Sequence, residues 1–270
     1  MPRAELPSDE RERVRGEFAA QGYSVQRGFL AAAELAELDA TLRAAIATRT
    51  HADVLDVGGL KFHHALYHHS AALRAFLASP KVVALVSAVA GPDLWMRWDQ
   101  AVEKKPGAGV FPWHQDNSYS DLVDPHFQLW IALTAMTRDN GGLWLVPGVR
   151  RRLPHTRSGP HTVCAVDERA KKFVAADAGD AVLFSSFTPH CTTPNVTDMG
   201  RWAYVAEFLR GSDVDPFLGP PFFLVAKDGV PAPRLVDEQP AARSLRNRLK
   251  YLRATLRGTT WAQRQARGAP

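Results

Sequence analysis

Cysteine is scarce in this chain, with two residues, Cys164 and Cys191, among 270. Two cysteines build no disulfide framework and match no zinc motif. A small fold held together by disulfides and one held together by zinc are therefore both excluded. Long apolar runs are missing too, because the longest, at 82–90, is well short of the ~20 residues that span a membrane. The first 14 residues are charged and lack the apolar segment of a secretory signal. These absences favour a cytoplasmic protein with reduced thiols that are buried or used as small packing residues.

Several catalytic and nucleotide-binding motifs are absent as well. No Walker or dinucleotide-binding glycine motif occurs, and Ser185 and Ser186 lack the G-x-S-x-G elbow of serine hydrolases. The net charge of +5 does not indicate a nucleic-acid-binding protein, because residues 241–270 carry eight Arg and Lys and no acid. Subtracting those eight charges leaves −3 for the rest of the chain, so no nucleic-acid partner is predicted.

What the chain does contain is a series of short runs of Trp, Val, Phe, Thr and Leu after residue 93, separated by turn residues. This pattern predicts antiparallel strands in a sandwich or barrel. Helical periodicity dominates before it. We therefore predict one domain over 1–240, with a helical part at 1–92 and a mainly β core at about 93–225. A basic amphipathic helix is predicted in the tail, 241–270, with its leucines on one face.

One turn signal lies inside the predicted core. Asn140 and Gly141 separate two strand-like segments, 127–136 and 143–148. Asn-Gly is the preferred pair of the type I′ turn that joins two adjacent antiparallel strands. The sequence therefore predicts a hairpin here.

The segment "FPWHQD" places His114 and Asp116 two positions apart in a predicted strand. Residues i and i+2 of a strand share a face, so the imidazole and the carboxylate converge while Gln115 points away. His190, after the strand-like "GDAVLFSS", is the candidate third ligand. Two histidines and one carboxylate on one face of an octahedron leave three positions open, which is typical of non-haem Fe(II) oxygenases.

Arg201 follows His190 by eleven residues, on the next predicted strand. A buried arginine fits the distal carboxylate of a dicarboxylic acid through a bidentate, charge-assisted pair. At this point the segments "WHQD", "NGGLWLVPG", "GDAVLF", "HCTTPN" and "RWAYV" resemble the phytanoyl-CoA dioxygenase family of Fe(II)- and 2-oxoglutarate-dependent enzymes. The resemblance covers most of residues 9 to about 225 and includes "GYSVQRGFL" and "SPKVVALVSAVAGPDL". It implies a double-stranded β-helix, or jelly-roll, core flanked by helices.

The resemblance also implies cofactors and their contacts. Fe(II), 2-oxoglutarate and O₂ are expected, with ascorbate as the reductant in vitro. The implied iron ligands are His114, Asp116 and His190, and the implied 2-oxoglutarate contacts are Arg201, Lys61, Met96, Trp130 and Thr192. Candidate substrate contacts, from their positions just after the metal motif, are Asn117, Tyr119 and His126. Related halogenases replace the carboxylate ligand by a small residue, so the presence of Asp116 favours oxygenation.

The implied reaction is hydroxylation of an unactivated C–H bond of a small molecule, lipid-like or a specialised metabolite, with release of succinate and CO₂. The same site could desaturate, cyclise or epimerise instead, because the outcome depends on how the substrate lies. The alternative outside the enzymes is a non-catalytic jelly-roll binding protein whose basic tail contacts a membrane or partner. No pattern indicates an oligomeric state.

Two further features have alternative interpretations. The cluster His63–His69 contains His64 and His68, which have a zinc-like i, i+4 spacing if the segment is helical. No carboxylate is interleaved, so we interpret these histidines as exposed or at the rim of a pocket. The basic tail has three interpretations: a helix docked on the body, a site for an anionic or thioester-linked substrate, or a helix on an anionic membrane.

Overall fold

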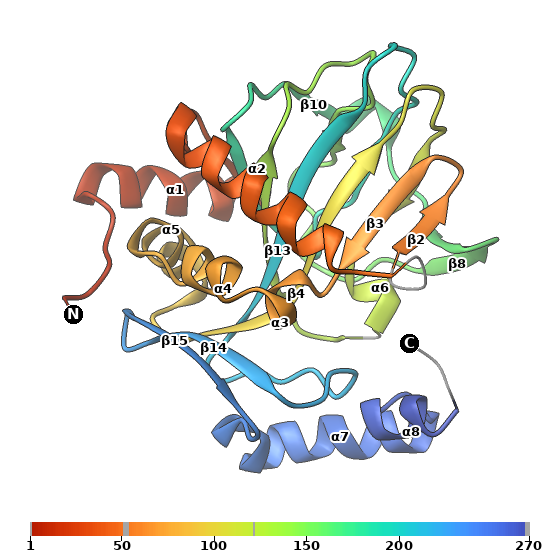
Figure 1. Cartoon of the computed structure of the whole chain (residues 1–270). Helices are drawn as coiled ribbons and strands as arrows, with labels where there is room; N and C mark the ends of the chain where they lie inside the picture. The colour runs from red at the N-terminus through yellow and green to blue at the C-terminus, as the bar shows by residue number, and fades with distance from the viewer. Residues whose placement is uncertain (1, 51–53, 121, 268–270) are drawn as a thin grey trace.

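Two antiparallel sheets form the body of the molecule (Figure 1). The computed structural model describes residues 2–50, 54–120 and 122–267. The larger sheet runs, in spatial order, β1 (Tyr23–Gln26), β11 (Ala181–Ser185), β6 (Phe127–Ala132), β13 (Arg201–Arg210), β4 (Leu94–Lys104), β14 (Phe222–Lys227) and β15 (Val230–Val236), with β3 (Leu60–His64) and β2 (Val54–Val57) added beside β4. The smaller sheet runs β10 (Lys172–Val174), β7 (Leu143–Leu145), β12 (His190–Thr192) and β5 (Phe111–His114). A separate hairpin pairs β8 (His155–Ser158) with β9 (His161–Cys164).

Alternation along the strands creates two apolar cores. On β13, Tyr204 packs in the core beneath the helices, whereas Val205 belongs to the core between the sheets. Successive residues of a strand face opposite ways, so one sheet contributes to both cores. Trp130 and Val205 of the larger sheet share a cluster with Leu143 of the smaller one, so the sheets pack face to face. The predicted mainly β, jelly-roll core with flanking helices is confirmed.

Five helices from the first part of the chain lie on the outer side of the larger sheet (Figure 1): α1 (Ser8–Gln21), α2 (Ala32–Ala47), α3 (Leu66–His69), α4 (Ala71–Leu77) and α5 (Pro80–Ala90). Gly22, at φ +85°, ends α1 and turns the chain into β1. The hydroxyl of Ser79 accepts a hydrogen bond from the Val82 amide and caps α5, whose first residue is Pro80. Within the described residues no helix alone is long and apolar enough for a membrane span, although the bent pair α4 and α5, taken together, meets the criterion by length and composition.

The β structure extends beyond the predicted core at both ends. The part predicted as helical, 1–92, also contains the β2–β3 hairpin, in which Gly58 and Gly59 both have positive φ. That backbone is the type I′ turn, and the Gly-Gly pair was its signal in the sequence. The β core also continues past the predicted limit near 225, because β14 and β15 extend the larger sheet to Val236. Residue 1 of the predicted domain lies outside the described residues.

The predicted Asn-Gly hairpin is also wrong. β6 pairs with β11 and β13, whereas β7 pairs with β10 and β12, so the two strands belong to different sheets. The Asn140 side chain accepts from the Thr137 amide and donates to the Ala135 carbonyl. Gly141 has φ +80°. The Asn-Gly pair therefore makes a tight turn, but the turn carries the chain from one sheet to the other.

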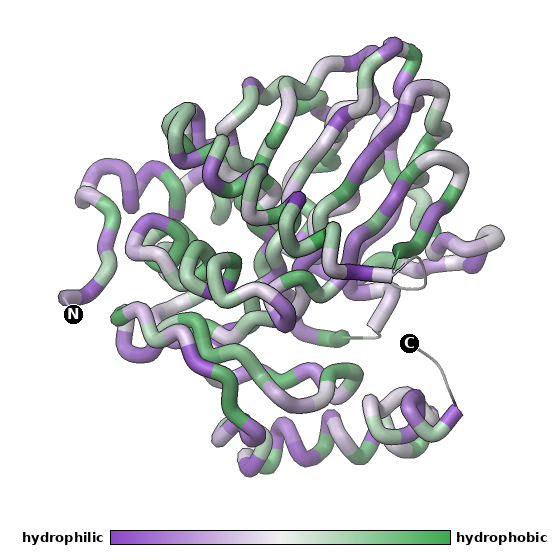
Figure 2. Tube along the Cα trace, viewed as in Figure 1, coloured by the Kyte–Doolittle hydropathy of each residue, from purple (hydrophilic) through white to green (hydrophobic). Residues whose placement is uncertain are grey.

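The tail forms the predicted basic helix, α7 (Leu245–Arg257), followed by α8 (Trp261–Gln265). Figure 1 shows α7 running past the β14–β15 hairpin, and Figure 2 shows its mixed hydrophilic and hydrophobic residues. The helix docks through charge: Lys250 lies 2.6 Å from Asp124, and Arg246 lies 3.1 Å from Asp213. Its leucines are left exposed, namely Leu245, Leu249, Leu252 and Leu256. Residues 268–270 of the predicted tail lie outside the described residues.

Candidate metal centre

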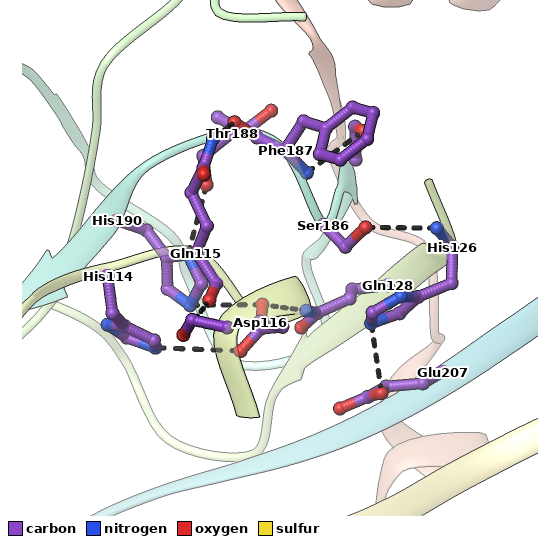
Figure 3. Close-up of polar contacts among 12 residues, drawn as sticks. His114, Gln115, Asp116, His126, Gln128, Ser186, Phe187, Thr188, His190 and Glu207 are labelled. Atoms are coloured by element: carbon purple, nitrogen blue, oxygen red, sulfur yellow. Dashed lines mark hydrogen bonds and ion pairs between the residues drawn. The ribbon is translucent and has the colours of Figure 1, made fainter. Parts of the chain in front are cut away.

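His114, Asp116 and His190 meet between the two sheets (Figure 3). β5 and β12 pair with His114 directly opposite His190, and the centres of the two rings are 4.0 Å apart. The Asp116 carboxylate lies 3.5 Å from Nε2 of each histidine, through Oδ1 to His114 and Oδ2 to His190. One donor atom from each residue lies within 4.8 Å of the others, and no other three His, Cys, Asp or Glu residues in the described part of the chain do so.

Both histidines turn the same nitrogen toward this point. Nδ1 of His114 lies 2.8 Å from the Pro112 carbonyl oxygen, and Nδ1 of His190 lies 3.1 Å from that of Thr188. A carbonyl oxygen only accepts, so each Nδ1 carries the proton and each Nε2 keeps a lone pair. Burial, together with His114, lowers the pKa of His190 to about 4, which favours the neutral ring.

The carboxylate completes a donor set that suits Fe(II). Burial opposes ionisation of Asp116, but His190 and His114 outweigh it and hold the pKa of this carboxyl below its usual range. Each of the three residues directs a free donor atom to one point. Two imidazoles and one carboxylate are the ligands that non-haem Fe(II) oxygenases use. The residues therefore fit the metal.

Asp116 reaches the site from a loop, which corrects the prediction of a shared strand face. β5 ends at His114, and Asp116 precedes the short helix α6 (Asn117–Ser120). Gln115 points away, as predicted, but it is fully buried. Its side chain donates to the Arg151 and Phe187 carbonyls at 2.9 and 2.5 Å and accepts from the Leu153 amide at 2.8 Å. This anchor fixes the loop that presents the carboxylate.

The three candidate ligands line a cavity of about 360 Å³, one end of which contains Arg201, Thr192 and Trp130. Arg201 is 1 % exposed, donates through Nη2 to the Gly141 carbonyl at 2.9 Å, and leaves its buried Nε without a partner. Burial lowers its pKa to about 10, and no carboxylate of the described residues pairs with it. A buried guanidinium with unused donors suits one carboxylate of a dicarboxylic acid. These residues therefore fit 2-oxoglutarate.

The opposite end of the cavity holds a charge network that was not predicted from the sequence. Arg97 pairs with Glu207 and, at 2.9 Å, with Asp215. His126 lies 3.2 Å from Glu207, and Figure 3 shows both beside Gln128, which donates to Asp116. Charged residues inside strands that are otherwise apolar, in "WMRWDQ" and "YVAEF", were the signal available in the sequence.

Two predicted 2-oxoglutarate contacts are not brought to the cavity. Lys61 lies on β3 between the cavity-lining Leu60 and Phe62, so it faces the other side of the sheet, 4.0 Å from Glu103. Met96 packs in the core beneath the helices. The register of β4 against β13 shifts at this point, which breaks the alternation that would otherwise place Met96 with the cavity-lining strand residues.

The three candidate substrate contacts have different places. Tyr119 lines the cavity, and its ring centre lies 5.8 Å from that of His114. Asn117 is fully buried and donates to the carbonyls of Leu122 and Asp124, so it holds its own loop. His126 is also fully buried, behind Glu207. Asn117 and His126 do not line the cavity, which corrects those two predictions.

The His63–His69 cluster forms no metal site among the described residues. His63 and His64 are consecutive on β3 and face opposite ways: His63 stacks on Trp202, whereas His64 lines the cavity. His68 lies on α3 against the ring of Tyr67. The interpretation as residues at a pocket rim therefore holds for His64.

Comparison with known proteins gives a consistent result. Residues 18–203 match the family model described as Phytanoyl-CoA dioxygenase (PhyH). Methylphosphonate hydroxylase of Gimesia maris is 29 % identical over 133 residues, 48 % of this chain and 51 % of that protein. Phytanoyl-CoA dioxygenase domain-containing protein 1 of Rattus norvegicus is 31 % identical over 168 residues, 56 % of this chain and 57 % of that protein. The matches thus span little more than half the length of these relatives.

A solved structure supports the fold. The non-haem α-ketoglutarate-dependent epimerase SnoN from nogalamycin biosynthesis superposes with a TM-score of 0.65 at 21 % identity, over 76 % of this chain and 85 % of that one. At this identity the likeness establishes the jelly-roll architecture.

Proposed function

Because this chain belongs to the phytanoyl-CoA dioxygenase family, we propose that it is an Fe(II)- and 2-oxoglutarate-dependent dioxygenase that hydroxylates an unactivated C–H bond of a small molecule. One observation carries the proposal: a single cavity contains both a two-histidine, one-carboxylate cluster and an unpaired buried arginine. The cluster suits iron, and the arginine suits a dicarboxylate cosubstrate. Succinate and CO₂ are the expected coproducts.

When bound, iron and 2-oxoglutarate supply the oxidising chemistry with O₂, and the chain supplies orientation and a dry cavity. His114 and His190 present Nε2 because backbone carbonyls hold their Nδ1 protons. Gln128 fixes the Asp116 carboxylate by donating to Oδ2. Arg201 would hold one carboxylate of the cosubstrate through its unused donors.

The substrate is proposed to be a lipid-like or specialised metabolite. The cavity walls include the apolar side chains of Leu55, Val57, Trp98, Phe217 and Leu218, beside the charged pair Arg97 and Glu207. An anionic or thioester-linked substrate is the second option. Phe217 also lines a smaller groove of about 150 Å³ that contains the exposed Arg253 of α7, so a basic side chain lies beside the cavity.

Desaturation, cyclisation and epimerisation are alternative outcomes at the same site. The epimerase among the structural relatives shows that this fold serves more than hydroxylation. Substrate pose, rather than the ligand set, decides among these outcomes. Product analysis with the true substrate distinguishes them.

The test uses purified full-length protein. Anaerobic addition of Fe(II) and 2-oxoglutarate should give a metal-to-ligand absorption band, and air with ascorbate should then give succinate. Asp116→Ala should lose both signals, whereas Asp139→Ala, at an exposed carboxylate outside the cavity, should keep both. Folded wild-type protein that shows no band would refute the proposal and favour the non-catalytic binding protein.

The tail supports a separate proposal, contact with an anionic membrane surface. The exposed leucines of α7 lie on a helix rich in arginine, the composition of helices that lie in a membrane interface. Co-sedimentation with vesicles containing phosphatidylserine should be strong for wild type and weak for the double variant Leu249→Glu/Leu252→Glu. Equal sedimentation of the two proteins would contradict membrane contact.

A cytoplasmic location is likewise a proposal. The free, buried thiols of Cys164 and Cys191 are consistent with reducing surroundings.

A further inference from the structure

Two buried basic side chains, Lys104 and Arg201, lie side by side at one end of the cavity. Lys104 ends β4 and Arg201 begins β13, and the two residues are direct partners in the antiparallel register. Lys104 is 0 % and Arg201 1 % exposed. Like charges directly opposite each other destabilise a sheet, and an unpaired buried charge is more costly still. Within the described residues no carboxylate forms an ion pair with either side chain, so the fold leaves this positive charge for an anion.

Lys104 does not line the cavity, but it holds a residue that does. Its Nζ donates to the Gly109 carbonyl at 2.7 Å and to the Thr192 hydroxyl oxygen at 3.0 Å. Thr192 lines the same cavity end as Arg201. Because the hydroxyl oxygen accepts from the lysine, its own O–H is left to donate elsewhere. A carboxylate at this end would then receive donors from both Thr192 and Arg201.

The backbone is shaped around the lysine. A Cβ on Gly141 would lie 2.5 Å from both Cδ and Cε of Lys104 and 2.6 Å from the Thr193 carbonyl oxygen. Gly141 also has φ +80° and supplies the carbonyl that Arg201 Nη2 binds. The tight turn at Gly141 therefore leaves room for the Lys104 side chain and supplies the carbonyl that Arg201 binds.

We propose that Lys104 is a positioning residue for the distal carboxylate of 2-oxoglutarate, acting by orienting the Thr192 hydroxyl as a donor and by adding a second positive charge beside Arg201. The inference rests on the proposed function, since it concerns the cosubstrate of that same site. This role of Lys104 makes the site selective for a 2-oxo acid with two carboxylates. 2-Oxobutyrate, which has the same 2-oxo acid end and no distal carboxylate, gains nothing from Lys104.

The experiment measures dissociation constants of 2-oxoglutarate and 2-oxobutyrate for the anaerobic Fe(II) protein from the absorption band. Lys104→Met, which keeps chain length and removes the charge, should weaken 2-oxoglutarate binding about 10- to 100-fold and leave 2-oxobutyrate binding unchanged. The matched control is Lys105→Met. It should behave as wild type because the side chain of Lys105, unlike that of Lys104, is only partly buried.

A second variant keeps the test decisive if Lys104→Met does not fold. Thr192→Val should also weaken 2-oxoglutarate binding selectively, and the double variant should lose less than the product of the two single effects, because both act through one hydroxyl. Equal affinity of wild type and either single variant for 2-oxoglutarate overturns the inference and leaves the proposed function intact. Wild-type protein that gives no band with 2-oxoglutarate refutes the proposed function itself.

Discussion

Two arginines, Arg97 and Arg201, line opposite ends of one cavity and are treated differently by the fold. Both are nearly inaccessible to solvent. Arg97 is enclosed by Glu207 and Asp215, and although burial disfavours its charge, these carboxylates raise its pKa. Arg201 binds the Gly141 carbonyl and lies 5.9 Å from the centre of the Trp130 ring, but it pairs with no carboxylate of the described residues. Burial lowers its pKa to about 10.

The difference in pairing indicates that Arg97 stabilises the fold and that Arg201 binds a ligand. A charge that the protein neutralises internally contributes to the fold and to the shape of the substrate end of the cavity. A charge that the protein leaves unpaired is costly in the free state and is retained because a ligand completes it. The same substitution at the two sites should therefore have opposite consequences.

The largest expected effect is on stability. Arg97→Met leaves the buried carboxylates of Glu207 and Asp215 without their guanidinium partner, so we expect it to lower the free energy of unfolding by about 3–5 kcal/mol. Arg201→Met removes an unpaired buried cation and should leave the metal-free protein as stable as wild type or more stable. Urea unfolding of the two variants beside wild type measures both values. Equal destabilisation by the two substitutions would contradict the distinction.

The next effect is on stabilisation by the cosubstrate. A ligand that binds only the folded protein at 100 times its dissociation constant adds about 2.7 kcal/mol to the free energy of unfolding. Wild-type protein with Mn(II) and excess 2-oxoglutarate should gain stability of this order, and Arg201→Met should gain almost none. Thermal unfolding with and without 2-oxoglutarate gives the comparison. Retained stabilisation in Arg201→Met would show that the carboxylate binds elsewhere.

The fold was predictable to the extent that local patterns determine it. The short strand-like runs predicted an antiparallel sandwich or barrel, and Gly22 predicted the end of α1. The jelly roll itself was implied by the family resemblance. The turn at Asn140 and Gly141 was recognised, but its partner strands were not, because a turn signal is local whereas sheet membership depends on the whole β core. The same limit applied to Met96, since a register shift between β4 and β13 leaves little trace in one sequence.

In the candidate site, too, residues with a local sequence signal were predicted, and a residue placed there by the fold was not. The residue types and spacing of His114, Asp116 and His190 indicated a metal site, and Arg201 was the candidate partner of a carboxylate. The structure brings all four residues to one cavity. Lys104 was missed because a lysine at a strand end normally indicates solvent. Only its burial opposite Arg201 shows that it belongs to the site.

Asn117 extends the comparison from charged to neutral groups. Its side chain donates to two backbone carbonyls in its own loop, so by the same reasoning it belongs to the fold. Asn117→Ala should lower the free energy of unfolding by about 1–3 kcal/mol and leave the 2-oxoglutarate dissociation constant within about twofold of wild type. Tyr119→Phe, at a cavity-lining position in the same helix, is the control and should have little effect on stability. A large change in cosubstrate affinity in Asn117→Ala would return this residue to the site.

The smallest effect expected is on pH dependence, and it follows from Lys104. Burial, aided by Arg201, lowers the pKa of Lys104 to about 7. The thiol of Cys191, beside Lys104, stays neutral because burial raises its pKa to about 12. Between pH 7 and 10.5 the unfolded chain holds a proton that the folded lysine lacks, so the free protein gains stability as pH rises. Cosubstrate binding has the opposite sign, because the dianion favours the protonated lysine.

Binding of 2-oxoglutarate at pH 8 should therefore take up about one proton, and the affinity should fall about tenfold between pH 6 and pH 8. Calorimetric titration in two buffers with different ionisation enthalpies measures the uptake. Lys104→Met should remove both the uptake and this part of the pH dependence, whereas Lys105→Met should keep them. If Lys104→Met kept the full proton uptake, the proton would belong to another group, and the unpaired charge at this end of the cavity would be that of Arg201 alone.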